Sequence, residues 1–453
     1  AHCYCGHQFG SFAGQLGDGA AIYLGEVVNR AGERWELQLK GAGLTPFSRT
    51  ADGRKVLRSS LREFLCSEAM HYLGVPTTRA GTVVTSDSRV ARDIFYDGRV
   101  THERCSVVSR VAQTFLRFGS FEIFKPRDPG AIGGRAGPSA GNEALRRTML
   151  DYVVRNFYPE AATRAAEDGN GGGGKMYREV VARTAALVAS WQCVGWTHGV
   201  LNTDNMSIVG LTIDYGPFGW MDAFDPDFVP NGSDHGAGRY SYRQQPAICK
   251  WNLRKLAEAL APALPLASAL ETLEADYDDA YRAAYEAGMR RKLGLATAQA
   301  GDAALFAALS EVMEATAVDF TSLFRVLAER DLAVATRLAG LCAAPSVLGK
   351  ALRRRLRISR PSVPPEQLQA LWAMAQEDPE ALAAKWNAPA AAIVEELRGE
   401  MEKLVTSAAI ARRVVAVEDM AGAEKRAMVS ARKLARPFEG PAPPRSAAEA
   451  AAA

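Results

Sequence analysis

Residues 196–216 constrain this chain more than any other stretch. They place Asp204, Asn205 and Asp214 within eleven residues, and the apolar residues in 208–213 favour two short β-type segments. A turn between such segments can bring a carboxylate and an amide carbonyl together. These oxygen ligands suit Mg²⁺, which proteins usually hold with few groups plus nucleotide phosphates. Asp204 and Asn205 are also typical of an ordinary turn, so both interpretations stay open at this point.

The spacing of this stretch matches the protein-kinase pattern in which H-R-D-L-x-x-x-N precedes D-F-G. Asn205 follows His198 by seven residues, and Asp214 begins a D-Y-G triplet. Val200 occupies the place of the catalytic Asp. Asp204 is the one nearby carboxylate that could act as the base in its place.

A glycine-rich segment at 10–19 precedes two predicted strands, at 20–27 and 35–40. Glycines let backbone N–H groups approach a phosphate closely, although a plain hairpin turn would also use them. The second strand ends in Lys40, and a predicted helix at 59–70 follows it.

The helix at 59–70 carries Glu63, twenty-three residues after Lys40. This order is typical of the kinase ion pair in which the Lys holds nucleotide phosphates and the Glu holds the Lys. The alternative is a solvated Glu63 that pairs with its neighbours Arg58 or Arg62.

Two further features have both a functional and a structural interpretation. Arg110 and Arg117 lie in apolar segments and would suit a polyphosphate, but they could also be surface arginines with buried stems. The histidines and cysteines at 2–7 lack the usual zinc-ligand spacing, so the residues 7–10 are expected to form a structured turn near the nucleotide.

Composition sets broad limits. The 453 residues are 48% hydrophobic with a net charge of +3, which predicts two or three lobes, no nucleic-acid partner and no membrane partner. Seven scattered cysteines indicate reduced thiols. The first residue is Ala, so we interpret the chain as a fragment or processed form whose compartment stays open.

The predicted fold class is α+β. Its parts are a β-rich nucleotide-binding part (1–124), a loop-rich insertion with a connecting helix at 143–157 (125–175), a catalytic part (176–300), a helical extension (301–435) and a disordered tail (436–453).

Taken together, these motifs resemble the selenoprotein O family over roughly residues 4–260. The matching segments are GHQFG at 6–10, GQLGDGA at 14–20, LQLKGAG at 37–43, LRSSLREF at 57–64 and residues 198–219. The resemblance implies a protein-kinase-like two-lobed fold. It also implies transfer of AMP from ATP to Ser, Thr or Tyr hydroxyls of proteins, with the nucleotide reversed.

The resemblance also implies residue roles. Asp204 becomes the proton acceptor, and Asn205 and Asp214 become ligands of Mg²⁺, or of Mn²⁺ as the alternative ion. The implied nucleotide contacts are Gly17, Gly19, Ala20, Lys40, Asp52, Gly53, Arg110, Arg117 and Asp214, with Glu63 in the supporting ion pair. Eukaryotic relatives are implied to be mitochondrial.

Three departures from the family pattern keep other functions open. Ala20 replaces the usual Arg, Cys5 replaces an Ala, and no Cys follows Cys342 where the family has a redox pair. The first rival is a protein kinase, which the Lys40 and Glu63 spacing favours and Val200 disfavours. The second is a catalytically silent pseudokinase that binds nucleotide or a partner as a scaffold.

Overall fold

The computed structural model describes four long stretches and several short ones. They are 1–93, 98–126, 135–168, 172–328, 346–347, 362–363, 365–378, 380, 394–395 and 397–399. Most of the predicted extension at 301–435 and all of the predicted tail at 436–453 therefore lie outside the described residues. None of the described helices is both long and apolar enough to cross a membrane.

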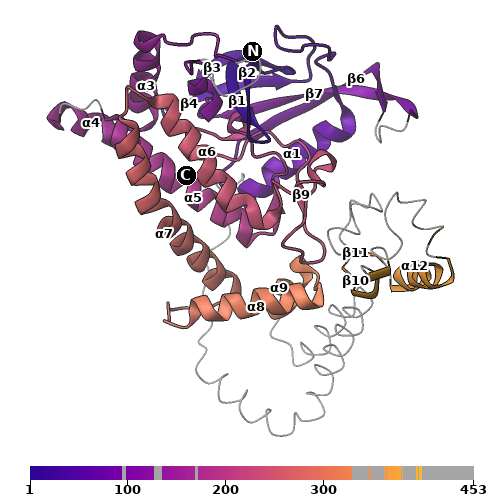
Figure 1. Ribbon diagram of the computed structural model, residues 1–453. Coiled ribbons are helices and arrows are strands. Elements are labelled where there is room, and N and C mark those ends of the chain that lie inside the picture. The colour runs from indigo at the N-terminus through magenta and orange to yellow at the C-terminus, as the bar shows by residue number, and fades with distance from the viewer. Residues whose placement is uncertain are drawn as a thin grey trace, which may run out of the picture.

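An antiparallel sheet of five strands and a separate two-stranded hairpin form the N-terminal part (Figure 1). The strands are β1 (Cys3–Gln8), β2 (Ser11–Gly17), β3 (Ala21–Val28), β4 (Arg34–Lys40), β5 (Lys55–Val56), β6 (Arg79–Asp93) and β7 (Val100–Ala112). Strand β7 is central, because β6 pairs with one edge while β4 and then β5 pair with the other. The sequence-predicted strands at 20–27 and 35–40 are thereby confirmed as β3 and β4.

The register of this sheet places three cations on one face. Lys55 of β5 pairs with Ser106 of β7, and Lys40 of β4 pairs with Val108 of β7. Arg110 follows Val108 by two residues on β7. Because side chains alternate with period two and paired residues share a face, Lys40, Lys55 and Arg110 point to the same side. Helix α1 (Leu57–Tyr72) lies on this side, where a serine–serine hydrogen bond of 2.8 Å joins it to β7.

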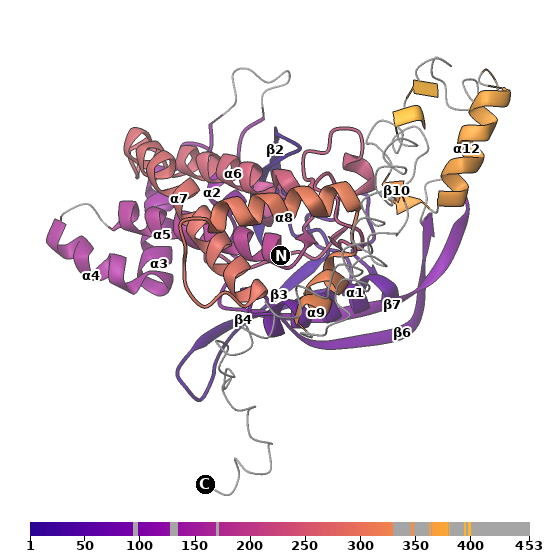
Figure 2. The same cartoon turned by 90° about the horizontal axis from the view of Figure 1, so that it is seen from below.

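Helices make up most of the remaining described chain, so the predicted mixture of α and β structure is confirmed. They are α2 (Phe118–Glu122), α3 (Glu143–Phe157), α4 (Pro159–Asp168), α5 (Gly173–Cys193), α6 (Gln245–Leu260), α7 (Leu266–Leu293), α8 (Asp302–Thr316), α9 (Phe320–Ala328) and α12 (Pro365–Glu377). Short elements connect them: β8 (Trp196–Thr197), η1 (Thr203–Asn205), β9 (Gly219–Trp220), η2 (Gly232–Asp234), η3 (Tyr242–Gln244), β10 (Ser346–Val347) and β11 (Ser362–Val363). Figure 2 shows α8 crossing the other helices, and the long β6–β7 ribbon reaching away from them.

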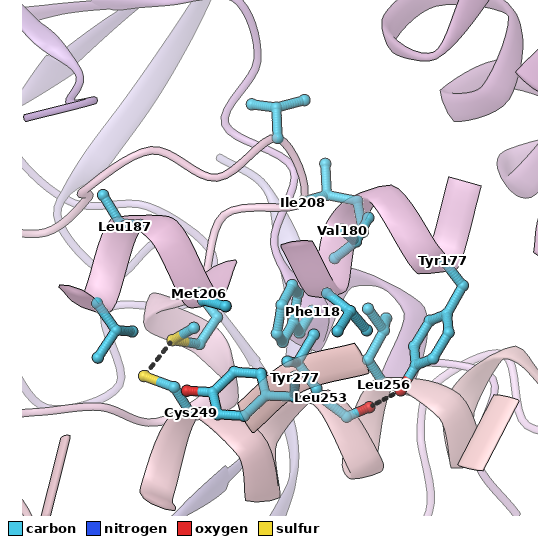
Figure 3. Close-up of a cluster of buried hydrophobic side chains, with 14 of the residues drawn as sticks. Phe118, Tyr177, Val180, Leu187, Met206, Ile208, Cys249, Leu253, Leu256 and Tyr277 are labelled. Carbon is cyan, nitrogen blue, oxygen red and sulfur yellow. Dashed lines mark hydrogen bonds between the residues drawn. The ribbon is translucent and has the colours of Figure 1, made fainter. Parts of the chain in front are cut away.

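The main hydrophobic core lies between α5, α6 and α7, and it holds the loop that follows η1 (Figure 3). Met206 and Ile208 are both buried in this core, and Met206 Sδ lies 3.9 Å from Cys249 Sγ of α6. Tyr177 of α5 donates a hydrogen bond to the Leu253 carbonyl at 3.0 Å. Because residues 206–210, directly after η1, are all buried, they anchor the η1 turn on this core.

One sequence expectation about this loop is wrong. The residues at 208–213 form no strand: Ser207 and Thr212 each make a single bridge, to Arg117 and to Thr77. The segment packs its apolar side chains into the helical core and touches other segments at single residues, so no continuous strand partner is available. Its apolar character reflects burial and not β pairing.

Candidate functional site

Lys40, at the end of β4, lies against Glu63 of α1, as the sequence spacing predicts. Lys40 Nζ is 3.0 Å from Glu63 Oε2, and Arg110 Nε donates to the other oxygen, Oε1. Burial opposes ionisation of this carboxyl, but the neighbouring Arg110 and Lys40 together lower the pKa of Glu63 below its ordinary value. Arg58 pairs instead with Glu103, so the local pairing proposed as the alternative for Glu63 is not the one observed.

Asp214 lies at the centre of this group of charges. Its Oδ1 accepts from Lys40 Nζ at 3.1 Å and from Arg110 Nη2 at 2.7 Å, and its Oδ2 contacts Arg117 Nη1. Although burial opposes it, Arg117, Lys40 and Arg110 hold the pKa of Asp214 well below its usual range. The backbone of Asp214 is left-handed, with φ of 59°, a conformation that is costly for a residue with a side chain and is concentrated at functional sites.

Arg117 joins Asp214 to the η1 turn. Its Nη1 also donates to the backbone carbonyl of Asp204 at 2.8 Å, and its Nη2 lies 3.1 Å from Asp18 Oδ1. Arg117 is 0% and Arg110 is 3% exposed, so the surface-arginine interpretation is wrong for both. Asp18 is a site residue that the sequence reasoning missed, although it stands inside the glycine-rich segment.

Asp204 is 3% exposed, and neither of its carboxylate oxygens has a partner with hydrogen-bond geometry among the described residues. The carboxylate is packed between the backbones of Gly6 and Gly119, where a Cβ on either glycine would collide with Oδ1. Burial, helped by the nearby Glu122 charge, raises the pKa of Asp204 to about 8. The Gln8 side chain is a donor that opposes this rise only in part. A buried carboxylate with so few donors is costly to keep ionised and readily takes up a proton.

The β1–β2 hairpin covers η1 and is held there by hydrogen bonds. The His7 backbone N–H donates to Thr203 Oγ1 at 2.8 Å, and the Thr203 hydroxyl donates to Glu122 Oε2 at 2.5 Å. Glu122 Oε1 lies 2.7 Å from His7 Nδ1, which closes the network. The expected turn at 7–10 is present, with Phe9 and Gly10 at positive φ. Glu122 is the second functional candidate that the sequence reasoning missed.

Asn205 and Asp214 carry an amide and a carboxylate oxygen, the donor types that suit Mg²⁺. Both Asp214 oxygens contact Lys40, Arg110 or Arg117 in this structure. The Asn205 amide nitrogen donates to the Val200 carbonyl at 2.9 Å, and no described residue donates to its side-chain oxygen. The described residues contain no group of three or more His, Cys, Asp or Glu around one metal position. The fit to Mg²⁺ therefore rests on one carboxylate and one amide, a small donor set that nucleotide phosphates would complete.

The segment with Gly17, Gly19 and Ala20 packs against the chain around residue 47. A Cβ on Gly17 would lie 2.5 Å from the Phe47 ring, and the Gly19 carbonyl accepts from Ser48 Oγ at 2.5 Å. The Ala20 carbonyl accepts from the Gly41 N–H at 2.7 Å, next to Lys40. These glycines allow close packing, and neither Gly17 nor Gly19 has a positive φ.

Asp52 and Gly53 lie apart from the charges on Asp214. The Asp52 carboxylate is exposed and pairs with Arg92 at 2.7 Å. Gly53 has φ of 66°, and a Cβ there would collide with the Gly43 carbonyl. The structure thus joins Lys40, Glu63, Arg110, Arg117, Asp214 and Asp204 through direct contacts, and it gives Asp52 no direct contact with them.

Comparisons with known proteins identify the family of this chain. The family model "Protein adenylyltransferase SelO" matches residues 1–343. The mitochondrial protein adenylyltransferase SelO of Mus musculus is 57% identical over 392 residues, and that of Homo sapiens is 56% identical over 392; each alignment covers 84% of this chain and 57% of the relative. A protein nucleotidyltransferase YdiU from Azoarcus sp. (strain BH72) is 50% identical over 332 residues, which cover 73% of this chain and 61% of the relative.

The chain thus spans just over half the length of these mammalian relatives. The family match covers the sheet, α1, the η1 loop and Asp214, which are the elements that carry the charged site. With more than half of its residues matched, the chain belongs to the protein adenylyltransferase SelO family.

Proposed function

We propose that this chain is a protein adenylyltransferase, which transfers AMP from ATP to Ser, Thr or Tyr hydroxyls of other proteins. One observation carries the proposal: Lys40, Arg110 and Arg117, which come from separate segments, converge on Asp214 in a buried group of charges. Polyphosphate binding uses this combination, because cations hold the phosphate oxygens and a carboxylate holds the accompanying metal ion. The names of the relatives support the same reaction.

The fold proposed with this function is protein-kinase-like and two-lobed. Residues 1–124 would form the nucleotide-binding lobe, 125–175 an insertion, and 176–300 the catalytic lobe, followed by the extension at 301–435. A five-stranded antiparallel sheet with one helix on its charged face, next to a helical core, supports this division. The Lys40–Glu63 pair at 3.0 Å supports it independently.

Asn205 and Asp214 would hold Mg²⁺ in this proposal. The ion, when bound, supplies positive charge beside the phosphates. Lys40, Arg110 and Arg117 would neutralise negative charge on the α-phosphate and on the departing pyrophosphate, in a buried setting where such interactions are strong.

Asp204 is proposed to accept the proton in the transfer step. The hydroxyl oxygen of the substrate forms a bond to the α-phosphorus of ATP, and the bond from that phosphorus to the bridging oxygen of pyrophosphate breaks. The hydroxyl proton moves to an oxygen of the ionised Asp204 carboxylate.

The test compares two labels in the same reaction. The purified chain is incubated with mixed proteins and ATP labelled at either the α- or the γ-phosphate, with Asp204→Ala in parallel. Label from the α-phosphate alone, lost in Asp204→Ala, is the expected result. Label from the γ-phosphate alone would indicate a protein kinase, which the Lys40–Glu63 pair also suits. Label from neither position would indicate a pseudokinase scaffold.

The mammalian relatives carry "mitochondrial" in their names. We extend that location to this chain as part of the same proposal. Imaging of the full-length protein, with the tag at its C-terminus, would test it against a mitochondrial marker.

A further inference from the structure

Lys55 is a cation beside the charged site to which neither the sequence motifs nor the family resemblance assigns a role. It begins β5, opposite Ser106 of β7, and it shares the sheet face of Lys40 and Arg110. Its side chain is half-buried. The turn after Lys40 passes so close that a Cβ on Gly41 would lie 2.6 Å from the Lys55 Cβ. Lys55 is thus fixed next to Lys40.

The charges around Asp214 balance without Lys55. Three cations, Lys40, Arg110 and Arg117, are in direct contact with three carboxylates, those of Glu63, Asp214 and Asp18. Each of the three cations is therefore matched by one carboxylate.

Lys55 makes no hydrogen bond or ion pair with any residue that the structure describes. The positive charge of Lys40, and then burial, lower the pKa of Lys55 to about 8. The carboxylates of Glu63 and Asp214 offset this repulsion only in part, and each of them is already in contact with other cations. A lysine that faces a neighbouring cation without an ion pair of its own is the arrangement expected where an anion is to bind. A lysine with a purely structural role would instead be paired or would extend into water.

We propose that Lys55 is a further phosphate-binding residue, which contacts the polyphosphate of the nucleotide alongside Lys40. The inference rests on the proposed function, because it assumes that the nucleotide binds at Asp214. Lys55 would add one positive charge to the nucleotide contacts that the family resemblance implies. This charge lies on the side of the site nearest β5. Ala20 lacks the side chain that the family usually has, and Lys55 would supply a phosphate contact from another strand.

The test measures binding of ATP, AMP and adenosine by calorimetry in the presence of Mg²⁺. Lys55→Met is expected to weaken ATP binding about tenfold, since a charge-assisted hydrogen bond is lost, and to leave adenosine binding unchanged. Lys55→Arg keeps the charge and should bind ATP within about threefold of the wild type. Arg54→Met is the matched control, because Arg54 is the adjacent residue and its side chain is exposed.

The outcomes separate the two proposals. If the wild type binds ATP and Lys55→Met binds it equally well, the assignment of Lys55 is wrong and the proposed function stands. An equal loss in Lys55→Met and Arg54→Met also overturns the assignment, because it would show only a general effect of charge. If the wild type binds no ATP, both proposals fail.

A second measurement needs no variant and so does not depend on Lys55→Met folding. The wild-type chain is treated with an amine-reactive anhydride, with and without MgATP, and modification is followed by mass spectrometry. ATP is expected to slow modification of Lys55 about tenfold while Lys250, which pairs with acids on the surface of α7, is unaffected. An unchanged rate at Lys55 would overturn the assignment.

Discussion

At the level of single residues, the two acids that the sequence motif emphasises have opposite surroundings. Asp214 is surrounded by three cations and has a strongly lowered pKa, whereas Asp204 makes no ion pair with a described residue and has a raised pKa. Two carboxylates whose environments push their pKa values apart are suited to different tasks. Asp214 is suited to holding charge, and Asp204 to accepting a proton.

Replacing Asp204 should separate transfer from binding. Asp204→Ala is expected to abolish AMP transfer and leave the affinity for MgATP within about threefold of the wild type, because its side chain contacts none of the cations. Label transfer and calorimetry measure the two effects. Asp87→Ala, at a side chain that is 99% exposed, is the control and should change neither. Full transfer activity in Asp204→Ala would show that another group accepts the proton.

The pH dependence of ATP binding should reflect Lys55. The charged groups that face it are Lys40, Arg110, Glu63 and Asp214, and Lys40 contributes most to lowering its pKa to about 8. The protonated form is the one that binds phosphate, so affinity should be flat below about pH 8 and fall as pH rises above it. Calorimetry at several pH values measures this. In Lys55→Arg this decrease of ATP affinity at high pH should disappear. An identical decrease in Lys55→Arg would show that a group other than Lys55 causes it.

Sequence spacing could identify Lys40, Glu63 and Asp214, because the kinase-type order fixes which residue follows which element. It could not identify Lys55 or Asp18. Lys55 reaches the site only through the register of β5 on β7, and Asp18 only through its contact with the distant Arg117. Such contacts depend on strand pairing and packing, which are not readable from local pattern.

At the level of elements, the β1–β2 hairpin is the part that the sequence describes least well. The turn at 7–10 is predictable from its residues, but the docking of the hairpin on η1 depends on His7, Thr203 and Glu122, which are far apart in the chain. The sequence pattern also predicted β-type segments at 208–213, which are wrong. An apolar run can be buried by helices as well as by a sheet, and the local pattern does not distinguish the two.

The hairpin network should contribute to stability. Glu122→Ala removes a buried carboxylate that His7 and Thr203 both contact, and we expect it to lower the free energy of unfolding by about 3 kcal/mol. Glu103→Ala is the control, because its partner Arg58 is exposed and such pairs contribute about 1 kcal/mol or less. Urea denaturation measures both. Equal losses in the two variants would mean that the network does not hold the hairpin.

At the level of the whole molecule, a helical core supports a charged site that lies on its border with the sheet. The family, the α+β class and the positions of β3, β4, α1 and α3 follow from sequence motifs and periodicity. What the sequence could not supply is the arrangement that brings β4, α1, β7 and the Asp214 loop together, because these contacts join segments up to 174 residues apart.

The core and the site should respond separately to mutation. Leu253 is fully buried between α5 and α6, so Leu253→Ala should lower the free energy of unfolding by about 3 kcal/mol. The affinity of the folded protein for MgATP should stay unchanged, since Leu253 contacts none of the charged residues. Denaturation and calorimetry on the same sample measure both quantities. A parallel loss of affinity would show that the core and the site are coupled.

The central claim is that Lys40, Arg110, Arg117 and Asp214 together bind one triphosphate. Calorimetric titration of MgATP into the wild type and into Lys40→Met tests it most directly, because Arg110 still contacts both Glu63 and Asp214 in the variant and should keep the site folded. The wild type is expected to bind MgATP, and the affinity of the variant should be at least about tenfold lower. Equal ATP affinity in the two proteins would contradict it.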